Sequence, residues 1–206
     1  MKKNFFLLVI TLMTSALWAQ TDYPLGISTS KEVDLGLSVN WAGYNVGAEM
    51  PQDYGYYYSW GEVDHLVKKG STGTTANQRF AIPIADLSNY PEKDAATANW
   101  GTKWHMPSLS DVKELFEKCS WEWMEYKGVL GYRVTGPNGN AIFLPSAGYD
   151  NGDYRAFQGT AGLYWTSTPF GGNAEGAYLI IFNDGQISTD TRHPNQGCSV
   201  RPVCTK

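Results

Sequence analysis

The sequence predicts an α+β domain, and two observations carry this prediction. One clear amphipathic helix is expected over residues 109–118, where apolar positions recur three and four apart. After it, Asn-Gly at 138–139 and Asp-Gly at 184–185 each separate two apolar runs, which indicates two β-hairpins. A helix followed by antiparallel hairpins with long loops is typical of α+β folds.

The composition narrows the class of protein. The 206 residues are 42% hydrophobic and 17% charged, and they include 8 Trp, 13 Tyr and 8 Phe. This content excludes a disordered chain, and the lack of heptads excludes a coiled coil. The formal net charge of −4 argues against binding through a basic surface, so no nucleic-acid partner is expected. The length suits one domain with its own core.

Residues 1–19 have the pattern of a secretory signal peptide. Lys2 and Lys3 precede an apolar run that continues to Ala19, and this run is shorter than the roughly 20 apolar residues of a membrane span. Cleavage after Ala19 would remove both lysines and take the net charge from −4 to −6. The alternative is an uncleaved, buried helix. With no transmembrane segment expected later, we expect an exported protein of the periplasm, cell surface or extracellular space.

The remaining chain divides into a linker and one domain. Residues 20–31 are the expected linker, and 32–206 are the expected domain. Its first part contains strand-like segments at 32–35 and 56–60, of which the second is Tyr-Tyr-Tyr-Ser-Trp. These five residues cannot all be buried if they alternate on a strand, so one side is expected to face a loop or solvent. Residues 63–92 are polar and irregular, which predicts a long loop insertion.

Two helices begin with capping signals. Asp94 is the expected cap of a short helix over 94–99. Ser108 and Asp111 form the pattern of a capping box at the start of the main helix. The apolar face of that helix is expected to pack into the core rather than to serve a function, and it consists of Leu109, Val112, Leu115, Phe116 and Cys119.

The second half of the chain is expected to be built from hairpins. A glycine- and aromatic-rich loop, 148–162, separates the two hairpins. The last strand is expected over 197–203, and Arg201 within it is interpreted as structural, with carboxylate or carbonyl partners. The expected hairpin strands are 131–135 with 141–145, and 178–182 with 186–188.

The cysteines are too few for a disulfide-built scaffold. Cys198 and Cys204 are expected to share the last strand, where six residues span about 20 Å, far beyond the roughly 7 Å limit between bridged Cα atoms. At most one disulfide inside the chain is therefore possible, and it would use Cys119. Buried free thiols are the expected state.

An ordered series of short motifs runs through most of the chain. It begins with Val-Asp-Leu-Gly-Leu-Ser-Val, passes through Trp-Gly-Glu and Trp-His-Met-Pro-Ser, and ends with Ser-Val-Arg-Pro-Val. The segments are 33–39, 45–48, 53–57, 60–62, 94–101, 104–108, 143–149, 164–168 and 199–203.

Over roughly residues 33–203, this series closely resembles the Fibrobacter succinogenes major paralogous domain, a family of exported bacterial proteins common in gut Bacteroidetes. The resemblance implies a C-type-lectin-like fold of the branch shared with formylglycine-generating enzymes and the variable proteins of diversity-generating retroelements. One main helix and a short helix would then pack on twisted antiparallel sheets. Because one fold hosts many functions, the resemblance implies a fold more than an activity.

No metal or cofactor is expected. A cluster of carboxylates and an amide at 150–153 is the nearest approach to a calcium site, but the Glu-Pro-Asn and Trp-Asn-Asp patterns of calcium-dependent lectins are absent. Residues 183–185 are interpreted as a turn. The three histidines lie far apart and match no zinc spacing: His65, His105 and His193.

No catalytic residue is predicted either. The chain contains no Gly-x-Ser-x-Gly motif. Glu122 and Glu125 flank Trp123 and Met124 and are interpreted as the exposed side of an aromatic strand rather than as a glycosidase pair. The spacing of the last two cysteines resembles the reactive pair of formylglycine-generating enzymes only superficially. A Ser/His/Asp site without a sequence signature stays open.

Binding is the favoured activity. Loops 148–162 and 190–196 are expected to meet, because each would connect neighbouring strands of the C-terminal sheet. Between them, Trp165 is interpreted as a core residue, whereas Tyr164 is open to either interpretation, as a core residue or as a ring of the binding surface. Aromatic rings with amide and guanidinium groups suit a glycan or a protein epitope. The candidate ligand-binding residues are Tyr149, Tyr154, Phe157, Arg192, His193, Asn195 and Gln196.

The sequence thus predicts an exported, non-enzymatic ligand-binding or adhesion module of the bacterial cell envelope. Two alternatives stay open, a secreted hydrolase with an unrecognised site and a structural subunit of a surface assembly. A pocket with convergent titratable groups would favour the enzyme, and a flat apolar patch would favour the assembly.

Overall fold

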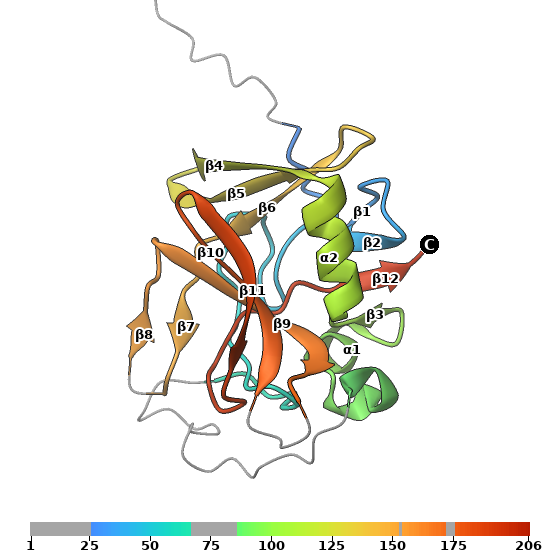
Figure 1. Cartoon of the computed structure of the whole chain (residues 1–206), viewed down its shortest axis with the longest axis vertical. Coiled ribbons are helices and arrows are strands. Elements are labelled where there is room, and N and C mark those ends of the chain that lie inside the picture. The colour runs from blue at the N-terminus through green and yellow to red at the C-terminus, as the bar shows by residue number, and fades with distance from the viewer. Residues whose placement is uncertain (1–25, 67–85, 153, 172–175) are drawn as a thin grey trace, which may run out of the picture.

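The computed structural model describes residues 26–66, 86–152, 154–171 and 176–206 (Figure 1). The predicted signal peptide, the first half of the predicted linker and the larger part of the loop insertion lie outside the described residues. Within the described part of the chain, no helix is both long and apolar enough to cross a membrane.

Both predicted helices are present with the predicted caps. Helix α1 (Ala95–Trp100) begins after Asp94, whose carboxylate accepts a hydrogen bond from the backbone N–H of Thr97. Helix α2 (Leu109–Lys118) begins at the capping box that Ser108 and Asp111 form. The end of the predicted loop insertion folds into two short 3-10 turns, η2 (Leu87–Asn89) and η3 (Pro91–Lys93).

A four-stranded sheet joins the two ends of the described domain. Its final strand pairs Val203 with Trp41 on one side and with His105 on the other. Neighbouring strands run antiparallel, in the order β1 (Glu32–Val33), β2 (Val39–Ala42), β12 (Val203–Thr205) and β3 (Trp104–His105).

Two three-stranded antiparallel sheets contain the predicted hairpins. In the first, β4 (Ser120–Tyr126), β5 (Val129–Thr135) and β6 (Ala141–Pro145) follow one another. The second has the order β11 (Gln186–Arg192), β10 (Ala177–Asn183) and β9 (Ala161–Pro169). The tight turn at 184–185 is confirmed by the pairing of Asn183 with Gln186. Antiparallel sheets with few helices confirm the α+β class.

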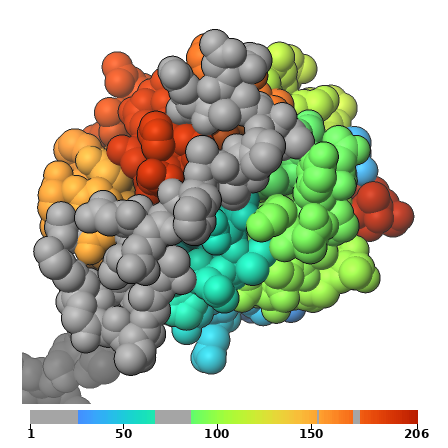
Figure 2. All heavy atoms as spheres, turned by 90° about the horizontal axis from the view of Figure 1, so that it is seen from below, coloured from blue at the N-terminus to red at the C-terminus, as the bar shows by residue number. Residues whose placement is uncertain are grey.

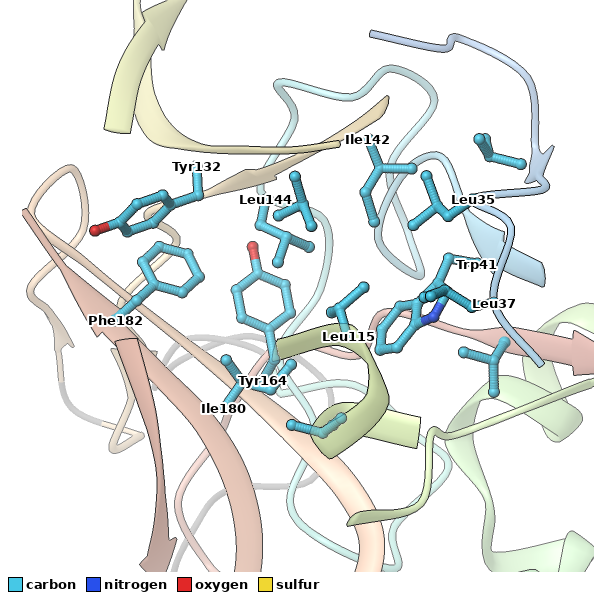
Figure 3. Packing of buried hydrophobic residues seen from close by; sticks show 14 residues of the cluster. Leu35, Leu37, Trp41, Leu115, Tyr132, Ile142, Leu144, Tyr164, Ile180 and Phe182 are labelled. Atoms are coloured by element: carbon cyan, nitrogen blue, oxygen red, sulfur yellow. The ribbon is translucent and has the colours of Figure 1, made fainter. Parts of the chain in front are cut away.

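The larger core cluster lies where α2 meets these sheets (Figure 3). Tyr164 of β9 stacks on Phe182 of β10 with ring centroids 5.7 Å apart, and Tyr132 of β5 meets Phe182 edge-on at 5.3 Å. Leu115 of α2 and Trp41 of β2 fill the other end of the same cluster and are fully buried. Each such side chain contributes on the order of 1.5–3 kcal/mol through the area it removes from water.

A second core cluster attaches residues 58–60 to strand β9. The indole of Trp165 donates a hydrogen bond to the carbonyl oxygen of Tyr58 at 2.8 Å, and the indole of Trp60 donates to that of Thr166 at 2.8 Å. Trp165 is fully buried. The interpretation of Trp165 as a core residue is therefore confirmed, and Tyr164, for which both interpretations were open, is a core residue as well.

The predicted strand over 56–60 is wrong. Tyr58 forms only an isolated bridge with Cys198, and the neighbouring Tyr57 and Tyr58 are both fully buried. Tyr56 is 45% exposed, so one tyrosine does face outward, but the alternation of a strand is lost. The two buried rings pack into different core clusters. Tyr57 packs with Leu66 and Ala147, and Tyr58 belongs to the cluster around Trp165.

The prediction of one last strand containing both late cysteines is also wrong. Cys198 lies in the isolated bridge to Tyr58, whereas Cys204 lies in β12. Pro202 separates the two segments and has no backbone N–H to continue a ladder. All three cysteines are free thiols, and burial raises the pKa of both Cys119 and Cys204 to about 11.

Candidate functional site

A cavity of about 400 Å³ lies between the sheet of β9–β11 and a short hairpin that precedes it. The hairpin, β7 (Tyr149–Asp150) with β8 (Arg155–Ala156), occupies much of the loop predicted over 148–162. Figure 2 shows the orange atoms of this hairpin beside the red atoms of the C-terminal strands on one face of the molecule. This cavity is the candidate ligand site.

The floor of the cavity is apolar. Ile181 of β10 pairs directly with Leu163 of β9, and the next pair on the same side is Asn183 with Ala161. These side chains share one face of the sheet because side-chain direction alternates along a strand. The opposite face, with Phe182 and Tyr164, belongs to the main core. Strands β9 and β10 are therefore apolar on both sides, and only one side borders the cavity.

The hairpin supplies two aromatic rings to the cavity. Tyr149 and Phe157 lie with ring centroids 5.9 Å apart and planes inclined at 47°. Phe157 is 62% exposed, and its backbone has a φ of 57°. Residues other than glycine rarely adopt this left-handed region, and it costs roughly 1–2 kcal/mol. A strained, exposed aromatic residue at the rim of a cavity is a feature of functional sites.

The hairpin is held in place from two sides. The hydroxyl of buried Tyr57 donates to the carbonyl oxygen of Ala147 at 2.5 Å and accepts from Nε2 of Gln158 at 3.1 Å. The guanidinium of Arg155 lies 4.7 Å from the centre of the Tyr57 ring. These contacts fix both ends of the hairpin, so its rings are positioned before any ligand binds.

Two backbone hydrogen bonds connect the hairpin to the segment after β11. The N–H of Asp150 donates to the carbonyl oxygen of Gly197 at 2.8 Å, and the N–H of Gly197 donates to that of Asp150 at 2.7 Å. The carboxylate of Asp150 is buried, accepts from the N–H of Gly152 at 2.7 Å and pairs with Arg155. This connection brings Gln196 to the cavity.

Four polar side chains complete the lining, and one of them is Thr160, which directly precedes β9. Asn183 ends β10, Arg192 ends β11, and Gln196 belongs to the turn that follows. Nη1 of Arg192 donates to the carboxylate of Asp190 at 2.5 Å and to the carbonyl oxygen of Thr191 at 2.9 Å. Oε1 of Gln196 is buried and has no hydrogen-bond partner among the described residues.

Four of the seven predicted ligand-binding residues line the cavity: Tyr149, Phe157, Arg192 and Gln196. The other three are not among its lining residues. Tyr154 is 59% exposed on the hairpin, His193 is exposed, and the carbonyl oxygen of Asn195 accepts a hydrogen bond from Ser59.

The prediction that the two loops connect neighbouring strands of one sheet is wrong. Residues 148–162 connect β6 to β9, which belong to different sheets, and residues 190–192 are part of β11 rather than of a loop. The loops meet through the backbone pairing of Asp150 with Gly197. Sequence analysis also missed five lining residues, Thr160, Ala161, Leu163, Ile181 and Asn183.

The described lining consists of aromatic, aliphatic, hydroxyl, amide and guanidinium side chains. Burial raises the pKa of Tyr149, and the neighbouring Tyr154 adds to that rise, so its hydroxyl is neutral near pH 7. The lining residues that the structure describes include no carboxylate, histidine or thiol. Glu122 and Glu125 lie exposed on β4 in the other hairpin sheet. The described residues contain no group of three potential metal ligands.

Comparison with known proteins gives one family match. Residues 134–203 match the model of a domain of unknown function (DUF8237). No curated protein matches the chain, and no solved structure matches it. All nine described residues that line the cavity fall within the matched segment, so the family model covers the candidate site.

Proposed function

We propose that this protein is an exported, non-enzymatic binding module of the bacterial cell envelope, whose ligand enters the cavity beside the β7–β8 hairpin. The observation that carries the proposal is the pair of rings at the cavity, where Phe157 is held exposed in a strained conformation. An exposed, strained aromatic ring at a preformed concave site costs free energy in the unliganded protein, and a ligand that packs on the ring gains from that contact.

The organisation of the chain supports the finer proposal of a C-type-lectin-like fold. The C-terminal strand β12 lies between β2 and β3, so the two ends of the described domain are joined in one sheet. The segment from β7 to β11, which carries the cavity, lies between these joined ends along the sequence. A fold closed in this way can vary its ligand surface without changing its framework.

The lining supports binding over catalysis. Hydrolases place a nucleophile or a pair of acid and base groups where the substrate sits. In the described part of the cavity the polar groups are instead two amides, a guanidinium and two hydroxyls, from Asn183, Gln196, Arg192, Tyr149 and Thr160. These groups donate and accept hydrogen bonds without exchanging protons at neutral pH.

A multivalent display of the mature protein on arrays of glycans and extracellular-matrix proteins tests the proposal. Phe157→Ala and Arg192→Ala should each lower the bound signal at least tenfold, because each removes a contact at the cavity. Tyr90→Ala is the matched control, since Tyr90 is 44% exposed and does not line the cavity. Equal binding by all three variants would show that the ligand surface lies elsewhere. Turnover in a hydrolase screen would replace the proposal with an enzyme.

A further inference from the structure

The positive charge at the cavity is already compensated. Arg192 directs Nη1 at the carboxylate of Asp190 and at the carbonyl oxygen of Thr191. Among the described residues, Nε and Nη2 of Arg192 have no acceptor. The guanidinium therefore offers the cavity N–H donors, but an approaching anion also meets the charge of Asp190. This arrangement favours a neutral acceptor over an anion.

One residue that lines the cavity, Gln196, also carries an acceptor that lacks a donor. Oε1 of Gln196 is buried, and no described residue donates to it. A buried polar atom without a partner is unfavourable, so a ligand group that donates a hydrogen bond there gains from satisfying it. A carboxylate has no proton to give near neutral pH, whereas a hydroxyl or an amide N–H has one.

The remaining surface suits a flat, partly apolar ring. Leu163 and Ile181 form the floor, and the rings of Tyr149 and Phe157 form one side. Aromatic rings pack against flat apolar faces. The volume of about 400 Å³ is at the small end of the roughly 300–1,000 Å³ that is usual for small-molecule sites. The site therefore has room for one or two sugar rings rather than for a protein loop.

We infer that the cavity binds a neutral pyranose residue, with hydroxyls that accept from Arg192 and donate to Gln196 while one sugar face packs on Phe157 and Tyr149. A hydroxyl is the group that serves both partners, because it donates and accepts. This inference rests on the proposed binding function and narrows its ligand from glycan or protein to an uncharged sugar.

The test compares matched sugars on the mature protein. Saturation-transfer NMR and chemical-shift titration are run with glucose against glucuronate and with galactose against galacturonate, so that each pair differs only in the carboxylate. At least one neutral sugar should bind with a half-saturation concentration tenfold or more below that of its acidic partner. Gln196→Leu replaces the amide, with its acceptor and its donors, by an apolar side chain of similar size and should weaken binding of that sugar about tenfold. Tyr90→Ala should leave it unchanged.

The outcomes separate this inference from the proposed function. An acidic sugar that binds as well as its neutral partner overturns the inference and leaves a binding module. Unchanged affinity in Gln196→Leu, with the fold verified by its melting temperature, also overturns it. Binding of no sugar, together with array binding to a protein that Phe157→Ala abolishes, overturns the inference alone. Binding to neither sugars nor arrays overturns both.

Discussion

Oδ1 of Asn45 accepts a hydrogen bond from Nε of Arg201 at 2.8 Å, and both residues are fully buried. The same guanidinium donates to the carbonyl oxygens of Ala42 at 3.1 Å and of Phe143 at 2.8 Å. Nδ2 of Asn45 donates to the carbonyl oxygen of Tyr54 at 2.9 Å. One buried cation thus connects β2, β6 and the segment before β12, as a structural arginine with carbonyl partners would.

Replacing Arg201 should destabilise the fold strongly. Burial lowers its pKa to about 10, which leaves the guanidinium charged at neutral pH. Arg201→Met would leave buried acceptors without donors, at a cost of roughly 1–3 kcal/mol for each such group. Urea unfolding measures this loss. Lys103→Met is the control, because that side chain is 56% exposed and solvent screens its ion pair with Glu32, so its loss should change the unfolding free energy little. Equal loss in the two variants would contradict a structural role for Arg201.

Glu114 should make the stability of the domain depend on pH in the acid range. Hydrogen bonds from Lys118 and then Ser38 lower the pKa of its carboxyl from 4.5 to about 2. The pKa of Glu114 is lower in the folded state than in the unfolded state. Its ionised carboxylate therefore stabilises the fold above about pH 4.5, and this stabilisation is lost as the pH falls toward 2. At pH 7, Glu114→Gln should cost about 1 kcal/mol in urea unfolding.

The difference in unfolding free energy between Glu114→Gln and the unmodified chain should therefore become smaller as the pH falls from 4.5 to 2. Glu117→Gln serves as the matched control on the same helix, since that side chain is exposed. A difference that stays constant across this interval would show that the carboxylate does not carry the contribution.

The leader should be removed on export. Lys2, Lys3 and the apolar run to Ala19 predict cleavage there, so intact mass spectrometry of the exported protein should give a chain that begins near Gln20. Leu8→Arg interrupts the apolar run and should leave the uncleaved chain inside the cell. An exported protein that still carries Met1 would disprove removal of the leader.

Local signals explain which elements could be predicted from the sequence. Asp94, Ser108 and Asp111 act on backbone groups within three residues, so both helices were predicted with their caps. The strand over 56–60 failed because distant contacts decide the local structure. Tyr57 bonds to a carbonyl 90 positions away, and Trp165 bonds to Tyr58 from 107 positions away.

The cavity could be predicted only in part. Tyr149, Phe157, Arg192 and Gln196 stood out as ring-bearing and polar side chains in expected loops. The floor residues Leu163 and Ile181 could not be predicted, because β9 and β10 are apolar on both faces and their sequences do not indicate which face borders a cavity. The same limit hid the pairing of the hairpin with Gly197, which forms between segments about 47 positions apart along the chain.

The strained backbone at Phe157 should make two substitutions differ in stability although they bind ligand equally. Its φ of 57° lies where glycine pays no steric penalty, and its ring is 62% exposed, so removing the ring loses little packing. Relief of about 1–2 kcal/mol of strain exceeds the roughly 0.4–1 kcal/mol that glycine costs through the unfolded chain. Phe157→Gly should therefore be about 0.5–1 kcal/mol more stable than Phe157→Ala in urea unfolding.

Both substitutions remove the ring and should weaken ligand binding to the same extent. If Phe157→Gly is more stable than Phe157→Ala, and both bind the ligand less well than the unmodified chain does, the strained backbone serves the ligand rather than the fold. If Phe157→Gly and Phe157→Ala unfold at the same urea concentration, the backbone is not strained. If Phe157→Gly retains binding, the ring is not part of the ligand surface, and the rim of the cavity must be assigned to Tyr149 alone.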